Sequence, residues 1–328
     1  MSLLRSAASI IPTEKSAPAG TGGIMDRKAR SMVLRLLSRM EQGMLHLEEG
    51  AESRTYGRLD TAFPLEATIR VHHPGFFRGI LLGGSVGAGE TYMRGWWSTD
   101  SLTDVIRIVL RNRMVMEDLD RGWSRLTAPI HRLFHILRRN TQRGSRKNIV
   151  AHYDLGNDFY ALFLDDTWTY SCGIFERDDS SLSEASSAKY ERICRKLRLR
   201  PEHHVVEIGS GWGGFAMHAA GRYGCRVTTT TISEQQYEMA RRRIRDAGLS
   251  ERVEIVKEDY RNLTGRFDRL VSIEMIEAVG HQYLETFFDA CSRLLKEDGL
   301  MALQAITMGD HVFDRHKHDV DFIKRYIF

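Results

Sequence analysis

Apolar and polar residues alternate in blocks along the second half of the chain, with strand-like runs followed by helix-like segments. The first strand-like run is VVEI (205–208), which leads through a glycine-rich turn into the helical pattern FAMHAAGRY (215–223). The same order continues to residue 306, with strands expected over RVTTTTI, VEIVKE, RLVSIEM and MALQAI and helices over SEQQYEMARRRIRDAG and YLETFFDACSRLL. Strands that alternate with helices in this way predict an α/β fold with a doubly wound, mostly parallel sheet.

The N-terminal part of the chain has a different pattern. Apolar residues recur at roughly helical spacing from Met25 to Leu47, which predicts one amphipathic helix. Residues 1–25 contain only brief apolar pieces between prolines and a GTGG stretch, so they do not have the apolar core of a signal peptide. We expect a flexible tail over these residues.

Short runs of strand-forming residues lie between glycines over residues 67–95. Two of these runs, ATIRVHH and GILLGG, are expected to be strands. The TDS stretch at 99–101 then offers N-caps for a helix over LTDVIRIVLRN. Together these elements predict a small α+β domain over residues 26–115.

Positive charge is concentrated in the segment that follows, over residues 116–150. Between Arg121 and His152 the chain has eight Lys or Arg residues and no Asp or Glu. Apolar residues from Trp123 to Leu137 could share one face opposite the arginines, and such a helix can lie on anionic lipid headgroups. The alternative is an ordinary solvated linker helix between two domains.

The composition is that of a globular protein, since 328 residues with 42% hydrophobic content can bury a sizeable core and form two domains. No apolar run reaches the roughly 18 residues of a spanning helix, so contact with a membrane is expected to be peripheral. The four cysteines have no CxxC spacing, which argues against a disulfide framework or a zinc site. The net charge of +4 is unremarkable. We expect a cytoplasmic protein with no metal site and no nucleic-acid partner.

The segment EIGSGWGG places Gly209, Gly211 and Gly214 in a GxGxxG arrangement between a strand and a helix, so the backbone can approach a ligand. A nicotinamide dinucleotide site would need an acidic residue about 20 positions later, where residues 229–231 are threonines. The acid instead lies at Glu207, before the first glycine, as in the first motif of methyltransferases. The loop therefore favours S-adenosylmethionine over NAD, and a tight turn that binds nothing is the alternative.

Several further segments resemble those of the cyclopropane-fatty-acyl-phospholipid synthases. They are HYDLGNDFYALFLDDTWTYSCGIF (152–175), TISEQQ (231–236), EDYRNL (258–263), SIEMIEAVGHQYLETFF (272–288) and VDFIKRYIF (320–328), and YMRGWW (92–97) resembles the N-terminal domain of that family. The resemblance spans the chain from about residue 30 to its end. It implies a Rossmann-like class I methyltransferase domain over residues 151–328, with S-adenosylmethionine as cofactor.

The reaction that the resemblance implies is methylene transfer to a cis double bond of a phospholipid acyl chain, followed by loss of a proton that closes a ring. An alkene is a weak nucleophile, so attack must rely on positioning and a dry pocket. The intermediate is a carbocation, which aromatic side chains can stabilise. Such side chains are plentiful before the glycine loop, although a core cluster is the alternative for most of them: Tyr153, Phe159, Tyr160, Tyr170 and Phe175.

The resemblance also implies roles for individual residues. Cofactor contacts are expected, beside Glu207, from Tyr170, Ser171, Gly209, Gly211, Thr231, Gln236 and Tyr260. Thr231 and Gln236 would replace the usual acidic ribose ligand. Cys172, through its backbone N–H, and Glu277 match positions that hold a bicarbonate ion acting as the base, so a thiol nucleophile is not implied.

The chain departs from the family pattern at Gln304, which stands where some members have a histidine that helps to hold bicarbonate. An amide can still donate a hydrogen bond there, but it cannot relay a proton. Ile306 matches a position whose backbone lines the same site, with a strand-core isoleucine as the alternative. The chain also stops at Phe328, where family members continue, so the methyltransferase domain is expected to lack its C-terminal part.

The resemblance finally implies a partner and a location. The substrate is expected to be unsaturated phospholipid at the inner membrane surface, where the basic segment and the N-terminal domain would contact headgroups or form a homodimer. Two other functions stay open. One is a methyltransferase that branches acyl chains without closing a ring, and the other is a catalytically silent lipid-binding paralogue.

Overall fold

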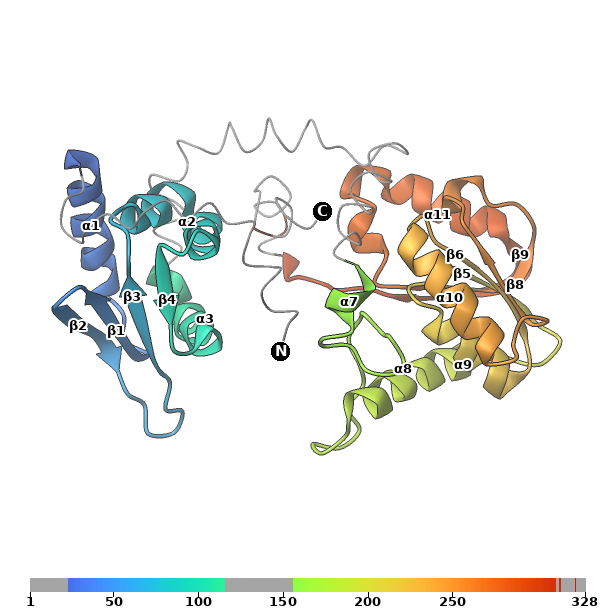
Figure 1. The fold of residues 1–328 in the computed structure, drawn as a ribbon. Coiled ribbons are helices and arrows are strands. Elements are labelled where there is room, and N and C mark those ends of the chain that lie inside the picture. Colours follow the sequence, from blue (N-terminus) through green and yellow to red (C-terminus); the bar gives the residue numbers. More distant parts are fainter. Residues whose placement is uncertain (1–22, 116–155, 311–312, 314–321, 323–328) are drawn as a thin grey trace. The chain divides into compact units, whose positions relative to one another are not determined.

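The computed structural model describes residues 23–115, 156–310, 313 and 322, and these residues form two compact units (Figure 1). The first unit contains residues 23–115 with Phe322, and the second contains residues 156–310 with Phe313. The expected tail ends earlier than predicted, because α1 already begins at Ile24. Residues 1–22, the basic segment 116–150, Tyr153 and the end of the chain lie outside the described residues.

The first unit is a four-stranded sheet covered by helices. Its strands lie in the order β2-β1-β3-β4, with β1 and β3 parallel and the other neighbours antiparallel. The elements are α1 (Ile24–Leu37), β1 (Gly43–Glu49), β2 (Glu52–Arg58), β3 (Glu66–Val71), α2 (Gly75–Met93), β4 (Trp97–Thr99) and α3 (Leu102–Arg111). The expected N-cap of α3 is present, because the Ser101 hydroxyl accepts a hydrogen bond from the Asp104 N–H at 3.3 Å.

Two predictions in this unit were wrong. The single helix expected over 25–47 ends at Leu37, and residues 43–49 form β1, in which buried Leu45 and Leu47 flank the half-buried His46. Buried and half-buried residues alternate here with the period of two of a strand. The apolar residues of the same stretch also fit helical spacing, so the sequence pattern did not reveal the strand. The expected strand GILLGG lies inside α2, which kinks at Gly84; a Cβ on Gly87 would come within 2.0 Å of the Gly79 carbonyl oxygen, so the two halves of α2 meet at glycines.

The second unit is the doubly wound α/β fold that the sequence predicts. Its five strands are all parallel and lie in the order β7-β6-β5-β8-β9. The strands are β5 (His204–Ile208), β6 (Arg226–Thr230), β7 (Val253–Val256), β8 (Phe267–Ile273) and β9 (Leu295–Gln304). The helices are α7 (Asn157–Tyr160), α8 (Leu182–Lys196), α9 (Gly214–Tyr223), α10 (Glu234–Asp246) and α11 (Leu284–Leu294), with short 3₁₀ turns at Tyr260–Asn262, Ile276–Ala278 and His281–Tyr283.

Helices cover both faces of this sheet, as Figure 1 shows. On one face Val205 packs in a core cluster with residues of α8, α9 and α10, and on the other Val206 and Ile208 pack with Phe287 and Leu294 of α11. Because successive strand residues point to opposite faces, both clusters draw on the same short strand. The VVEI run is therefore apolar on both sides.

No helix in the described part of the chain is long and apolar enough to cross a membrane.

Candidate functional site

The residues expected to carry chemistry gather at the carboxyl edge of the parallel sheet. In open α/β sheets this edge is where ligands bind. Each strand contributes there: the glycine loop follows β5, Thr231 follows β6, Tyr260 follows β7, Glu274 and Glu277 follow β8, and Gln304 and Ile306 lie at the end of β9. The expectation that these separated segments share one site is thus consistent with the strand order.

The backbone of the glycine loop has positive φ angles, which residues other than glycine adopt only with strain. Gly209, Gly211 and Gly213 have φ values of 95°, 49° and 86°. The N–H groups of Gly209 and Ser210 donate to the Thr230 carbonyl at 3.1 and 2.8 Å, which fixes the loop against β6. A Cβ at Gly211 would meet nothing within 4 Å, so the loop is open at this point. The open backbone fits the approach of a ligand.

Thr231 and Gln236 lie beside this loop. Both are buried, and the Thr231 hydroxyl donates to the Gln236 side-chain oxygen at 2.8 Å. The Ser233 hydroxyl caps α10 by accepting from the Gln236 N–H at 3.3 Å. The cap and the threonine therefore fix the amide of Gln236 next to the loop.

Glu207 lies in the sheet core with 2% of its surface exposed. Its carboxyl group accepts a hydrogen bond from the Thr229 hydroxyl at 2.6 Å. Burial raises the pKa of Glu207 to about 8, against the opposing effect of this hydrogen bond. The structure thus gives Glu207 a partner inside the sheet, and its expected cofactor contact stays a prediction.

The raised pKa predicts a pH-dependent effect of Glu207→Gln. The folded state keeps a proton on Glu207 between pH 4.5 and about 8, where the unfolded chain has lost it, so this residue destabilises the protein increasingly as pH rises through that window. Glu207→Gln should therefore raise the free energy of unfolding at pH 8.5, by on the order of 5 kcal/mol at most, and near pH 5 the gain should fall below about 1 kcal/mol. Urea unfolding at the two pH values measures the difference.

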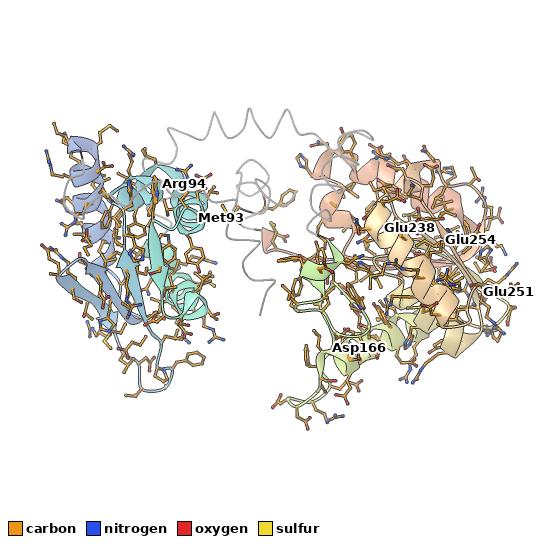
Figure 2. All side chains as sticks on the ribbon, viewed as in Figure 1. Met93, Arg94, Asp166, Glu238, Glu251 and Glu254 are labelled. Carbon is orange, nitrogen blue, oxygen red and sulfur yellow. The ribbon has the colours of Figure 1, made fainter. Side chains whose placement is uncertain are left out.

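A matched control for this experiment is Glu254→Gln. Glu254 also accepts a hydrogen bond from a threonine on the neighbouring strand, Thr228, at 3.3 Å, but it is exposed (Figure 2). Its substitution should change stability little at either pH. A gain for Glu207→Gln that is the same at both pH values would contradict the burial argument.

Tyr170, Ser171 and Cys172 form a segment that approaches the sheet from before α8. Tyr170 is 47% exposed, and its ring contacts that of the buried Tyr160 at 5.2 Å between centroids. The Ser171 hydroxyl accepts a hydrogen bond from Lys189 Nζ at 2.5 Å. Sequence reasoning missed Lys189, which is 1% exposed and whose pKa burial lowers to about 8.

The aromatic residues expected near the site divide into two groups. Tyr160 belongs to the core, because it is 1% exposed and its ring lies 4.8 Å from that of Trp212 in the glycine loop. Phe159, Tyr170 and Phe175 are exposed. The core alternative therefore holds for Tyr160, whereas the rings of Phe159, Tyr170 and Phe175 reach the surface.

Cys172 lies against a residue that sequence reasoning did not single out, Glu274. The Cys172 N–H donates to Glu274 Oε1 at 3.0 Å, and the Gln304 amide Nε2 donates to the same oxygen at 2.8 Å. Gln304 Nε2 also lies 3.3 Å from the Cys172 sulfur. The hydrogen bond to Glu274 and burial raise the pKa of the Cys172 thiol, so it is not a thiolate at neutral pH.

Glu277 lies next to the end of β9. Its Oε1 accepts a hydrogen bond from the Ile306 N–H at 2.5 Å, while the Ile306 side chain is 70% exposed. The other oxygen, Oε2, is buried, and no described residue gives it a hydrogen bond. A buried carboxylate oxygen without a partner is costly, which is typical of a functional position.

Tyr260 occupies the loop after β7. Its side chain is half-buried, and its ring packs edge-on against Phe287 of α11 at 5.6 Å. Burial raises its pKa. The phenol is thus fixed by packing.

Sequence reasoning also missed Arg243, which ties the glycine loop to the segment before α8. From α10, its guanidinium donates to the Trp212 carbonyl at 2.6 Å and to the Asp166 carbonyl at 2.9 Å. Trp212 Nε1 in turn donates to Asn157 Oδ1 of α7 at 2.8 Å. These hydrogen bonds join residues that are between 31 and 77 positions apart in the sequence, so no local pattern could have revealed them.

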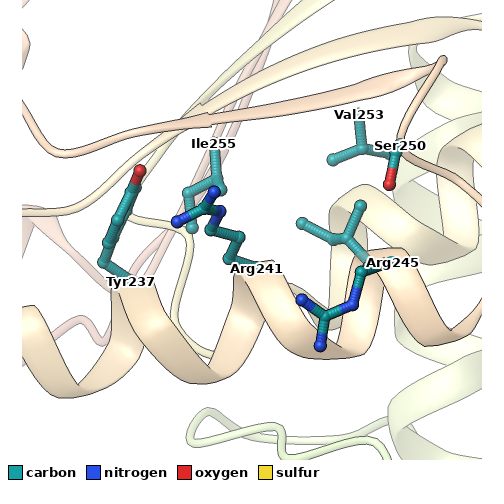
Figure 3. A pocket seen from close by; sticks show the side chains of 7 residues that line it. Tyr237, Arg241, Arg245, Ser250, Val253 and Ile255 are labelled. Atoms are coloured by element: carbon teal, nitrogen blue, oxygen red, sulfur yellow. The ribbon is translucent and has the colours of Figure 1, made fainter.

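A surface groove of about 330 Å³ lies elsewhere, between α10 and the edge strand β7. It is lined by Tyr237, Arg241 and Arg245 of α10 and by Val253 and Ile255 of β7 (Figure 3). None of the expected site residues lines this groove, so it is separate from the candidate site.

The residues at the carboxyl edge fit S-adenosylmethionine better than a metal. The open glycine loop follows β5, and the Thr231 hydroxyl, which donates to the Gln236 amide, follows the neighbouring strand β6. Within the described part of the chain, no group of three or more His, Cys, Asp or Glu side chains could hold a metal ion. All four cysteines are free thiols.

Comparison with known proteins adds independent findings. Residues 140–328 match the family model described as mycolic acid cyclopropane synthetase. The chain is 39% identical over 271 residues to the cyclopropane-fatty-acyl-phospholipid synthase of Escherichia coli, covering 80% of this chain and 65% of that protein. It is 37% identical over 275 residues to the tuberculostearic acid methyltransferase of Mycobacterium tuberculosis, covering 81% of this chain and 64% of that protein.

Among solved structures, a cyclopropane synthase from Mycobacterium tuberculosis superimposes with a TM-score of 0.52 and 32% sequence identity, covering 56% of this chain and 67% of that one. The chain spans just under two thirds of the length of both curated relatives. The class I methyltransferase fold expected for the second unit agrees with this superposition.

Proposed function

This chain belongs to the family of mycolic acid cyclopropane synthetases, and on that premise we propose that it transfers a methylene group from S-adenosylmethionine to the cis double bond of unsaturated phospholipid acyl chains. The observation that carries the proposal is the convergence, at one edge of the sheet, of an open glycine loop and two fixed carboxylates. We assign the reaction to residues 151–328.

The chain's own residues would hold the cofactor and keep the site dry. Gly209 and Gly211 leave space along the backbone, and the Gln236 amide and Tyr260 lie at the neighbouring strand ends. When bound, S-adenosylmethionine supplies a methyl group activated by a positively charged sulfur. The exposed rings of Phe159 and Tyr170 would exclude water and stabilise the carbocation on the acyl chain.

The expected bicarbonate ion does not fit the donors assigned to it. The Cys172 N–H and the Gln304 amide both donate to Glu274, and the Ile306 N–H donates to Glu277. A second anion between two carboxylates would meet repulsion instead of free donors. We therefore assign no step to bicarbonate.

The proposal is tested by incubating the protein with methyl-labelled S-adenosylmethionine and vesicles of unsaturated phospholipid. Label should enter the lipid in an amount that grows with time and protein. Binding of the cofactor without any label in lipid would instead identify a catalytically silent lipid-binding protein.

The second candidate, methyl branching without ring closure, is favoured by the relative named as a tuberculostearic acid methyltransferase. The two reactions differ in their products. Mass spectrometry of the labelled acyl chains would show saturated methyl-branched chains, formed only with a reductant, if branching is the reaction.

We also propose that the protein works in the cytoplasm at the inner membrane surface, as a single chain or a homodimer, and that the basic segment 116–150 contacts anionic headgroups. Neutralising four of its arginines (Arg138, Arg139, Arg143 and Arg146) to Gln should weaken binding to vesicles that contain anionic lipid at low salt, because each basic residue near the surface contributes about 1 kcal/mol. Vesicle sedimentation measures the change. Unchanged binding would favour the linker interpretation.

A further inference from the structure

Glu274 has a backbone conformation that costs energy. It follows β8 with φ at 48°, one of three described non-glycine residues with positive φ. Its N–H donates to the Gln304 carbonyl at 2.9 Å, so the strained residue is fixed to β9. An L-residue in this region loses about 1 kcal/mol or more, and such strain is concentrated at functional sites.

In this backbone conformation the Glu274 carboxylate meets two hydrogen-bond donors from distant parts of the chain. Oε1 accepts hydrogen bonds from the Cys172 N–H and from Gln304 Nε2. Hydrogen bonds to a carboxylate stabilise its charged form and fix its direction. The second oxygen receives neither of these bonds.

The other groups around Glu274 are each protonated, hydrogen-bonded elsewhere or buried, so Glu274 is the group that can act as the base at this site. The Cys172 thiol stays protonated at neutral pH. Lys189 is buried and donates to Ser171 Oγ, next to Cys172 in sequence. Glu277 directs one oxygen to the Ile306 N–H and has the other buried.

We propose that the Glu274 carboxylate is the general base of the reaction, in the place expected for bicarbonate. This inference rests on the proposed function. It names a catalytic residue inside the chain where the sequence analysis expected an external ion.

The alkene π electrons form a bond to the methyl carbon, the C–S bond breaks with its electron pair on sulfur, and the neighbouring acyl carbon becomes a cation. Glu274 then takes one proton from the added methyl group. The electron pair of that C–H bond closes the ring, and the protonated Glu274 returns its proton to water.

Glu274→Gln tests the inference directly, because it keeps the size and one acceptor oxygen but removes the basic charge. Turnover should fall by about 100-fold or more, while the Kd for S-adenosylmethionine changes less than about threefold. The matched control is Glu251→Gln, an exposed carboxylate before β7, at the opposite, amino end of the parallel strands (Figure 2). It should leave both quantities unchanged.

Glu274→Gly supplies a second readout that does not depend on turnover. Glycine relieves the positive φ, so this variant should fold, and removal of the carboxylate frees the Cys172 N–H and the Gln304 amide for a small anion. Sodium bicarbonate or formate, compared with chloride, should raise the Tm of the variant but not that of the wild type. The same anions should restore turnover at least about tenfold.

Two results would overturn the inference: a Glu274→Gln variant that turns over within about threefold of the wild type, or a folded Glu274→Gly variant that neither gains Tm nor recovers turnover with these anions. A wild-type protein that labels no lipid refutes the proposed function instead. In that case the Tm response of Glu274→Gly still shows whether the carboxylate fills an anion site.

Discussion

Glu277→Gln is expected to lower turnover by about 100-fold or more while leaving the affinity for S-adenosylmethionine within about twofold of the wild type. Glutamine keeps an oxygen that can accept the hydrogen bond from the Ile306 N–H. It replaces the buried, unpartnered Oε2 by an NH₂ group and removes the negative charge. Without the negative charge of Glu277, the carbocation is less stabilised. The substitution does not change the glycine loop, to which we assign cofactor binding.

Steady-state kinetics with lipid vesicles and calorimetric titration of the cofactor separate these two effects. Glu285→Gln is a suitable control, because Glu285 is an exposed residue in the first turn of α11 on the same stretch of chain. A parallel loss of cofactor affinity in Glu277→Gln would show that Glu277 belongs to the cofactor site.

Gly211→Ala is expected to weaken cofactor binding by about tenfold or more without unfolding the protein. Alanine at a φ of 49° costs about 1 kcal/mol in backbone energy, and its methyl group would meet no protein atom within 4 Å. The methyl group would instead occupy the space that we assign to the ligand. Titration with S-adenosylmethionine gives the change in Kd, and thermal unfolding gives the change in stability.

Gly248→Ala separates ligand obstruction from backbone strain. Gly248 follows α10 with a φ of 69°, and a Cβ there would also meet nothing within 4 Å. Both variants should lose similar stability, but only Gly211→Ala should lose affinity. Equal affinity in the two variants would mean that the open space at Gly211 does not face the cofactor.

The second unit could be predicted from the sequence because its signals are local and agree with one another. Strands such as VVEI, the helical segments that follow them and the glycine turn all indicate the same order of elements, and the structure confirms it. The N-terminal unit was predicted less well. In α2 the glycines serve a contact between two helical halves, and that contact depends on tertiary packing.

In the candidate site, too, some residues could be predicted from the sequence and others could not. Motif resemblance brought Cys172, Glu277, Gln304 and Ile306 into one hypothesis. The structure pairs Gln304 with Cys172, pairs Ile306 with Glu277, and places the last three of the four at or after the ends of neighbouring strands. Glu274 was missed because its importance comes from a positive φ and from donors 102 and 30 residues away. Lys189 was missed because a lysine in an amphipathic helix gives no sign that it is buried.

In the proposed reaction an acyl double bond takes up a methyl carbon from S-adenosylmethionine and closes a ring with loss of one proton. The direct test uses cofactor whose methyl group carries only deuterium, together with unsaturated phospholipid vesicles, and reads the acyl chains by mass spectrometry and NMR. We expect a cyclopropane ring that keeps two of the three deuterium atoms. Lipid without deuterium, or a branched chain in place of the ring, would contradict this reaction.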